Sequence, residues 1–391
     1  MVQHEHASIL RVREPHRHHR VTYVELFFDL VFVFAVTQIS HTLLAHFTAL
    51  GLAQVTILML AVWWVWVFTS WTTNWLDPEK TSVRVMLFGL MIAGLLLSTS
   101  IPKAFEARGL AFALAFVAMQ VGRSLFVVAM VPKSETGHRH NFLRIACWMS
   151  ASGVFWIAGG LAEPALRVGL WIIALAIEYA GPAMRFRTPG LGASTMQEWE
   201  VEGGHMAERA ALFIIIALGE SIVVTGATFS EAPWTAPAIV AFLVALLGSI
   251  AMWWIYFHIG AEAGAEHISS AAESGRLARL AYTYIHLPIV AGIVVSAVGD
   301  ELLLAHPLGH SGVKEVFGIV GGPLIYLSGT ILFKRTIRGH LQLSHLVGIA
   351  LLLALLPVAG SLSPLALAAA VAVVLIVVAT WEAISLGSGE R

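Results

Sequence analysis

The sequence predicts an all-α membrane protein of about 12 transmembrane helices, arranged as two parallel six-helix repeats. Of its 391 residues, 58% are hydrophobic and only 12% are charged, and the mean hydropathy is +0.80. Long apolar stretches recur along the whole chain, and the positive charges between them gather on one side. This composition excludes a soluble protein, and the net charge of −1 excludes a general nucleic-acid binder.

Each predicted helix is an apolar stretch close to the roughly 20 residues that a helix needs to cross a bilayer. The fifth stretch contains Gly153, Gly159 and Gly160, and the eleventh ends at Pro357, so these two are the weakest helices. The twelve stretches lie at about 24–47, 51–75, 83–101, 109–131, 142–161, 165–184, 207–228, 236–258, 278–298, 313–333, 341–358 and 364–384.

The distribution of Lys and Arg over the loops supports the same number of helices. With twelve spans, 18 of the 23 Lys and Arg residues lie on the side shared by both termini and four on the other side, while Arg123 lies inside a span. Loops rich in Lys and Arg stay in the cytoplasm. We therefore expect both termini to be cytoplasmic.

The two halves of the chain resemble each other. Glu25 aligns with Glu208 and Gly159 with Gly360, with offsets that grow from 183 to 201. Six helices per repeat is an even number, so the halves would run parallel, related by an axis along the membrane normal. The predicted parts are a cytoplasmic His- and Arg-rich arm at 1–22, a first half at 23–184, a cytoplasmic linker at 185–205, a second half at 206–385 and a cytoplasmic tail at 386–391, with a short interfacial helix at 261–276.

The first span, Tyr23 to Phe47, carries two carboxylates. Glu25 and Asp29 are four residues apart and therefore share one helix face. A charged side chain at the centre of a membrane helix costs roughly 2.5–3.5 kcal/mol on insertion scales. That face must point at protein or water, and the two carboxylates are candidates for ion transport.

Arg123 and Glu178 fall at a depth similar to that of the span-one carboxylates. An arginine inside a membrane segment usually pairs with a carboxylate. Asp29 is the first choice as partner, with Glu25 or Glu178 as alternatives. The pair would either lock helices together or form part of a transport site, and the sequence leaves both possibilities open.

The seventh span opens with His205, Glu208 and Arg209 and carries Glu220 near the bilayer midplane. Because 205 to 209 is one turn and 209 to 220 is about three, His205, Arg209 and Glu220 share a face. A carboxyl at that depth is protonated, paired or exposed to water. Glu220 is therefore a candidate for a proton or cation relay, and the alternative is a neutral structural glutamate.

His286 lies in the ninth span, two residues before Pro288. Proline frees a backbone carbonyl of the preceding turn, and an imidazole can carry a proton near neutral pH. This segment is a candidate lining of a pathway, although a histidine that hydrogen bonds to a neighbouring helix explains it equally well.

Motifs for enzymes, cofactors and metals are absent from the sequence. We find no GxGxxG, GxxxxGK, HExxH or GxSxG motif, and the single cysteine, Cys147, excludes an intrachain disulfide. The histidines of His4–His6 and His16–His19 are better explained as a solvated basic arm than as metal ligands. The missing motifs disfavour an enzyme but leave open an intramembrane enzyme that uses His205 and Glu208, and the sequence predicts no cofactor and no metal site.

Four motifs together resemble the bacterial low temperature requirement protein A family, and His205, Glu208 and Arg209 add to the likeness. The motifs are ELFFDLVFVFAVTQISH (Glu25–His41), LGESI (Leu218–Ile222), WWIYF (Trp253–Phe257) and HLPIVAGIV (His286–Val294). The resemblance implies a polytopic protein of the bacterial cytoplasmic membrane, and it supplies no mechanism.

The leading functional hypothesis is a secondary transporter or permease that moves a small cation or a proton-coupled solute. Its partners would be the lipid bilayer and that small ion or solute. One alternative is a membrane sensor or scaffold for stress and cold adaptation, without flux. Another is an intramembrane enzyme that acts on lipid. The sequence leaves the substrate, the direction of transport and the oligomeric state open.

Overall fold

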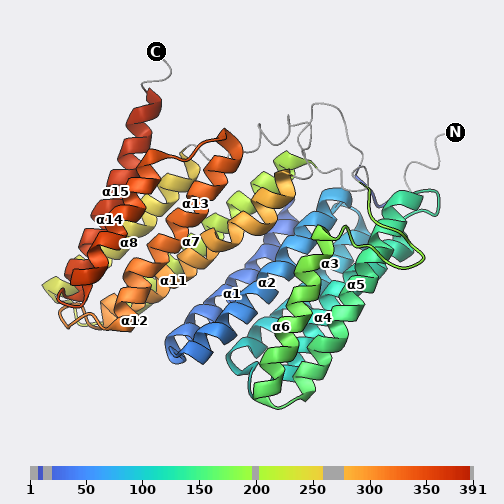
Figure 1. Ribbon diagram of the computed structural model, residues 1–391, viewed down its shortest axis with the longest axis horizontal. Helices are drawn as coiled ribbons and strands as arrows, with labels where there is room; N and C mark the ends of the chain where they lie inside the picture. The colour runs from blue at the N-terminus through green and yellow to red at the C-terminus, as the bar shows by residue number, and fades with distance from the viewer. Residues whose placement is uncertain (1–7, 12–19, 196–201, 259–276, 388–391) are drawn as a thin grey trace. The chain divides into compact units, whose positions relative to one another are not determined.

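The computed structural model describes residues 8–11, 20–195, 202–258 and 277–387, and the described chain is an all-α membrane protein (Figure 1). Eleven of its helices are long and apolar enough to cross a membrane. Its internal contacts divide the chain into two compact units, Met1–Met206 and Ala207–Arg391. We call these unit 1 and unit 2.

Unit 1 is a bundle of six helices. Helix α4 packs against α5 and α3, α5 packs against α6, and α1 packs against both α2 and α3. The helices are α1 (Tyr23–Ala45), α2 (Ala49–Trp75), α3 (Thr81–Ser100), α4 (Gly109–Met130), α5 (Thr136–Leu161) and α6 (Pro164–Ala183).

Helix α2 supplies much of the core of unit 1. Every residue from 61 to 76 is buried, including Trp63, Trp64 and Trp66. Other helices of unit 1 therefore cover this part of α2 on every side. The indole of Trp64 stacks on Tyr179 of α6, with ring centroids 3.9 Å apart. The tryptophans of α2 therefore pack inside the protein.

Arg167 joins the loops at one end of unit 1. Its guanidinium donates to the carbonyls of Ala104 (2.9 Å), Glu106 (2.7 Å), Gly159 (3.0 Å) and Ala162 (3.0 Å), and to Gly160 at 3.5 Å. These carbonyls belong to the α3–α4 connection and to the end of α5. Backbone groups at helix ends lack partners within the helix. Arg167 supplies a hydrogen-bond donor to five carbonyls in these two segments.

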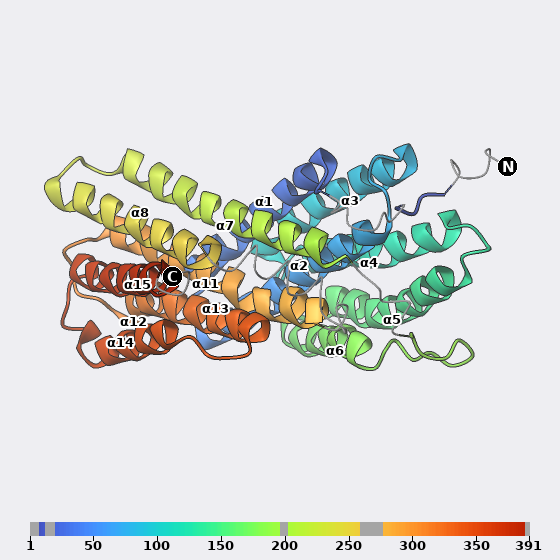
Figure 2. The same ribbon diagram turned by 90° about the horizontal axis from the view of Figure 1, so that it is seen from above.

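Unit 2 is also helical, and Figures 1 and 2 show α14, α15 and α8 side by side, as their contacts require. Helix α11 packs most closely on α13, while α15 packs on α8 and α14. The unit consists of α7 (Gly203–Glu231), which begins in unit 1, then α8 (Ala236–Phe257), α11 (His286–Ala305), α12 (Val313–Val316), α13 (Gly322–Arg338), α14 (Leu343–Ala359) and α15 (Pro364–Gly387).

Glycines allow α11 and the chain around α13 to touch through their backbones. A Cβ added to Gly299 would lie 2.5 Å from the carbonyl carbon of Gly318, and one added to Gly292 would lie 2.5 Å from the backbone nitrogen of Tyr326. Small residues at membrane helix interfaces allow such approach, and the association then rests on van der Waals packing.

Two segments of unit 2 are π-helical, Arg279–Ile285 before α11 and Phe317–Gly321 before α13. Each of the predicted ninth and tenth spans is therefore one continuous helical stretch that contains a π-helical segment. Single π turns within helices are frequent at functional sites. The first of these π-helical segments ends at Ile285, directly before His286.

The fifth predicted span departs from expectation, whereas the eleventh lies within two residues of its predicted bounds. Helix α5 is longer than predicted, because it begins at Thr136. Helix α14 has 17 residues, short of a full span, and contains Pro357 two residues before its end. Three predictions lie outside the described residues: the histidine motifs His4–His6 and His16–His19, and the interfacial helix at 261–276.

Candidate functional site

Glu25 lies in the first turn of α1 and is fully buried. Its Oε2 accepts hydrogen bonds from the backbone N–H and the hydroxyl of Thr22, both at 2.9 Å. Arg11 Nη2 lies 3.2 Å from Oε2, and His205 Nε2 lies 2.9 Å from Oε1. This carboxylate therefore binds the N-terminal arm, the start of α1 and the start of α7 within unit 1.

Arg11 is itself held by the end of α2. Its Nε donates to the carbonyls of Thr73 (2.9 Å) and Leu76 (2.8 Å), and its backbone N–H donates to Trp75 O at 2.8 Å. The last carbonyls of a helix lack intrahelical partners. Arg11 satisfies those of α2 while it neutralises Glu25.

Asn74 determines the tautomer of His205. The side chain of Asn74 accepts from Glu202 N (3.0 Å) and donates to Glu202 O (2.9 Å), which fixes the orientation of its amide. Its NH2 group therefore faces His205 Nδ1, at 3.3 Å. Nδ1 is then the acceptor, and the proton sits on Nε2, where it is donated to Glu25. Arg11 and His205 approach each other to 3.2 Å because both donate to the same carboxylate.

A second network crosses unit 1 through Gln120. Arg123, which is buried, donates to Thr69 Oγ1 at 2.9 Å and to Gln120 Oε1 at 2.5 Å. Gln120 Nε2 donates to Glu178 Oε2 at 3.1 Å. The hydrogen bonds of Arg123 thus lead to Glu178, one of the two alternative partners, and not to Asp29 as first expected.

Glu178 has three hydrogen-bond donors inside the bundle. Besides Gln120, Ser152 Oγ donates to Oε1 at 2.6 Å and Trp156 Nε1 donates to the same oxygen at 3.0 Å. All of these side chains are buried. A buried charge is tolerated when it is paired and hydrogen bonded. Helices α4, α5 and α6 are joined by this network.

Asp29 is buried and accepts a hydrogen bond from Trp66 Nε1 of α2 at 2.8 Å. Glu25 and Asp29 do lie on the protein side of α1, as their shared face predicted. The exposed face of α1 carries Tyr23, Phe27 and Leu30 instead.

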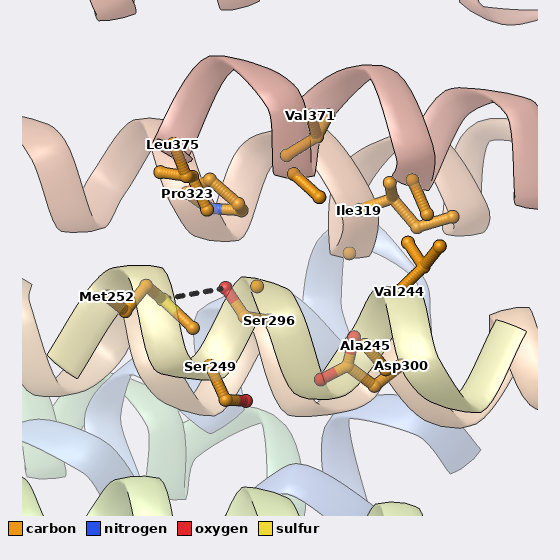
Figure 3. A pocket seen from close by; sticks show the side chains of 14 residues that line it. Val244, Ala245, Ser249, Met252, Ser296, Asp300, Ile319, Pro323, Val371 and Leu375 are labelled. Atoms are coloured by element: carbon orange, nitrogen blue, oxygen red, sulfur yellow. Dashed lines mark hydrogen bonds between the residues drawn. The ribbon is translucent and has the colours of Figure 1, made fainter. Parts of the chain in front are cut away.

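Unit 2 contains a cavity of about 30 Å³ with a carboxylate in its wall (Figure 3). Asp300 and Ser296 of α11 and Ser249 of α8 supply its polar lining. Ser221 of α7 donates to Asp300 Oδ2 at 3.4 Å. Since about 10–15 Å³ suffices for one water molecule, this cavity has room for water or for a small cation.

The cavity wall also includes apolar residues from α15, such as Leu375, and Met252 of α8, whose sulfur lies 4.0 Å from Ser296 Oγ. The π-helical segment contributes Gly318 and Ile319. Polar oxygens thus face a mostly apolar wall. In such surroundings the attraction between a carboxylate and a cation is stronger than it is in water.

The other span-seven candidates lie on α7. His205 is in its first turn and belongs to unit 1, while Glu208, Arg209 and Glu220 belong to unit 2. Arg209 is buried, and Glu208 and Glu220 are half-buried. Glu220 directly precedes Ser221, the residue that donates to Asp300.

His286 is fully buried between α8, α11 and α13. Its Nδ1 lies 2.8 Å from the carbonyl of Ala281, so Nδ1 carries the proton, and its Nε2 accepts from Tyr256 OH at 2.8 Å. The ring of Phe333 packs edge-on against the imidazole, with centroids 4.5 Å apart. Both ring nitrogens are satisfied within unit 2.

Several residues in these networks were missed from the sequence. Asp300 and Lys334 lie just beyond the spans predicted at 278–298 and 313–333, where a charge is taken as part of a loop, and Glu382 lies two residues before the end of the span predicted at 364–384. Gln120 and Asn74 were missed because they are uncharged. The signal that could have found Asp300 and Glu382 is a carboxylate within an apolar stretch at helical spacing. In the described part of the chain no cluster of three or more His, Cys, Asp or Glu residues is placed to hold a metal ion.

Comparison with known proteins gives one family and one close relative. The model of the bacterial low temperature requirement A protein family matches residues 20–380. The chain is 41% identical over 373 residues to the uncharacterized protein RA0937 of Rhizobium meliloti (strain 1021), covering 94% of this chain and 90% of that protein. No solved structure matches the chain.

Proposed function

Because the chain belongs to the bacterial low temperature requirement A family of membrane proteins, we propose a membrane function built on unit 2: secondary transport of a small cation or a proton-coupled solute. The observation that carries this proposal is the water-sized cavity with Asp300 in its wall. Asp300 would bind the proton or the cation.

The chemistry of the cavity supports this assignment. Asp300 supplies a negative charge, and Ser249 and Ser296 supply hydroxyl oxygens from two different helices. Oxygen ligands of this kind suit small hard cations, and a lone carboxylate suits a proton. An ionisable residue inside a membrane protein that borders a cavity marks an ion or proton pathway more often than a lipid-facing surface.

The topology of the proposal follows the loop charges. We place the protein in the bacterial plasma membrane with both termini in the cytoplasm, since 18 of its 23 Lys and Arg residues fall on that side. We also propose that units 1 and 2 are parallel repeats. On this view the networks of Glu25 and Glu178 make unit 1 a rigid frame, and unit 2 carries the ion.

Flux measurements on purified protein in liposomes test this function. A pH-sensitive dye inside the vesicles reports proton movement when a pH gradient is imposed alone or together with a gradient of Na⁺, K⁺ or Li⁺. We expect gradient-driven flux from the native protein and background flux from Asp300→Asn. Glu301→Gln removes the neighbouring carboxylate, which lies outside the cavity lining, and serves as the matched control that keeps full flux.

Two outcomes would refute the proposal. One is the absence of flux across the cation panel and a set of small solutes. The other is equal flux from the native protein and Asp300→Asn. A sensor or scaffold role, which the buried hydrogen-bond networks of unit 1 favour, predicts the first outcome together with recovery of partner proteins from membranes.

A further inference from the structure

Unit 2 contains a buried cluster of charged groups at the end of α13, the start of α14 and the end of α15. Lys334 Nζ lies 2.6 Å from Glu382 Oε2, and His345 Nδ1 lies 3.2 Å from Glu382 Oε1. Ser344 Oγ lies 3.4 Å from the same Oε1. The side chains of Lys334, His345 and Glu382 are 2%, 0% and 5% exposed, so the cluster is inside the protein.

The cluster is connected to the walls of the Asp300 cavity. Lys334 Nζ also donates to the carbonyl of Ile255 at 2.8 Å, and Ile255 is three residues from Met252, which lines the cavity. On α15, Glu382 is seven residues from Leu375, another lining residue. At 1.5 Å per residue this places the cluster about 10 Å from the cavity along that helix.

One nitrogen of His345 has no partner among the described residues. Because Nδ1 faces the carboxylate of Glu382, it carries the ring proton in the neutral imidazole. Nε2 is then an acceptor, and this buried atom makes no hydrogen bond within the described chain. If the cluster served only to join α13 to α15 through an ion pair, His345 Nε2 would have no role as a proton acceptor.

We propose that Lys334, His345 and Glu382 form the cytoplasmic proton-exchange site of unit 2. A proton that enters from the cytoplasm and reaches the buried His345 Nε2 gives an imidazolium. The imidazolium then releases its Nδ1 proton to Glu382 Oε1, which leaves a neutral imidazole and a neutral carboxylic acid. Lys334 keeps its charge throughout and stabilises Glu382 in its ionised form, so the site accepts a proton and returns it.

The surroundings of the cluster contain few other groups that titrate. Helix α8 contributes Tyr256, α11 contributes His286, which Tyr256 binds, and α13 contributes Tyr326, whose hydroxyl donates to the Met252 carbonyl at 2.5 Å. Arg335 follows Lys334 and is exposed. His345 and Glu382 are therefore the pair in this cluster between which a proton can move.

This inference rests on the proposed transport function, and one measurement separates the two. Infrared difference spectra of the purified protein in lipid, recorded between acidic and alkaline buffer, report the protonation of carboxyl groups without any flux. We expect a carboxylic acid band that disappears in Glu382→Gln and remains in Glu301→Gln. If the band is present but the liposomes show no flux, the exchange site stands and the transport function fails.

His345→Asn distinguishes proton exchange from a structural ion pair. The asparagine amide reaches the position of Nδ1 and still donates to Glu382, but it cannot bind a proton. We expect this variant to fold, to elute as the native protein does and to lower proton-coupled flux roughly tenfold or more. Native flux and an unchanged infrared band in His345→Asn, or a band unaffected by Glu382→Gln, would overturn the proposal. If Glu382→Gln does not fold, His345→Asn alone decides.

Discussion

Gln120 separates Arg123 from Glu178 and bonds to both, accepting from the guanidinium through Oε1 and donating to the carboxylate through Nε2 at 3.1 Å. The amide dipole is oriented between a positive and a negative charge. Both ions are then stabilised although they do not touch. The charges belong to α4 and α6, so the amide couples two helices that flank α5.

The first prediction concerns the coupling of these two charges. Arg123→Gln and Glu178→Gln each leave one buried charge without its counter-charge, so each should destabilise the protein by about 3–5 kcal/mol. The double variant contains neither charge and should cost less than the sum of the two. Unfolding of the detergent-solubilised protein by denaturant measures all three.

Asp29→Asn provides the comparison for that double-mutant cycle. Asp29 hydrogen bonds to Trp66, and Arg123 to Thr69 and Gln120. The coupling of Arg123 to Asp29 should therefore be smaller than its coupling to Glu178. Larger coupling to Asp29 would show that the network through Gln120 is not the one that stabilises Arg123.

The second prediction concerns Arg167. Arg167→Lys keeps the positive charge but replaces a planar group with several donors by a single ammonium, which cannot reach five carbonyls on two segments. We expect a loss of about 2–4 kcal/mol, since buried carbonyls would lose their partners. Arg108→Lys is the control, because Arg108 is exposed and donates to the Thr99 carbonyl. Equal melting temperatures of the two variants would contradict the assignment.

The third prediction uses the tautomer of His205. The amide nitrogen of glutamine reaches the position of Nε2, whereas that of asparagine reaches the position of Nδ1. His205→Gln should therefore keep the donor to Glu25 and be about 1–2 kcal/mol more stable than His205→Asn. Chemical unfolding of both variants measures the difference. The opposite order would place the proton on Nδ1.

How far the sequence predicts this fold depends on length and periodicity. The apolar stretches predicted the helices well because a bilayer demands a length close to 20 residues, and α1 to α4 lie within a few residues of their expected bounds. The π turns before α11 and α13 could not be predicted, since winding of this kind depends on contacts between helices, such as the one between Gly318 and Gly299 of α11.

The site was harder to predict than the fold. Charge inside an apolar stretch correctly marked Glu25, Asp29, Arg123 and Glu178 as buried. Which side chains these residues contact depends on how the helices are rotated relative to one another. The sequence shows only which residues share a face of the same helix. The link from Arg123 to Glu178 needed a neutral glutamine, and Asp300 and Glu382 were hidden near helix ends, where solvated charges are common.

The fourth prediction concerns the glycine contact between α11 and the segment before α13. A Cβ at residue 299 would lie 2.5–2.8 Å from backbone atoms of Gly318 and Ile319, which cannot move aside as a flexible side chain could. Gly299→Ala should destabilise unit 2 by about 1–3 kcal/mol. Gly226→Ala on α7 is the control, because nothing lies within 4 Å of its added Cβ. Gly226→Ala should leave the stability of the protein unchanged or raise it, since alanine favours the helix over glycine by up to about 1 kcal/mol. Similar melting temperatures for the two variants would show that the helices can separate without cost.

The last prediction concerns Glu220, which precedes Ser221 on α7 and lies 17 residues after Gly203, where the helix begins. Glu220→Gln preserves the volume and most of the hydrogen bonding but cannot ionise, so a structural glutamate would tolerate the change. A relay to Asp300 would not. We expect a folded, membrane-inserted Glu220→Gln protein that has lost the pH dependence of its flux.

Glu220→Asp keeps a carboxyl that is displaced by one methylene, and we expect it to retain part of the flux with a shifted pH profile. Ser221→Ala removes the hydroxyl that donates to Asp300 at 3.4 Å while Glu220 stays intact. If Glu220 passes protons to Asp300 through this hydroxyl, Ser221→Ala should reduce flux to a similar extent. Full flux from Glu220→Gln at every pH tried would exclude Glu220 from the pathway. Asp300 would then exchange protons only through the cavity and the cluster of Lys334, His345 and Glu382.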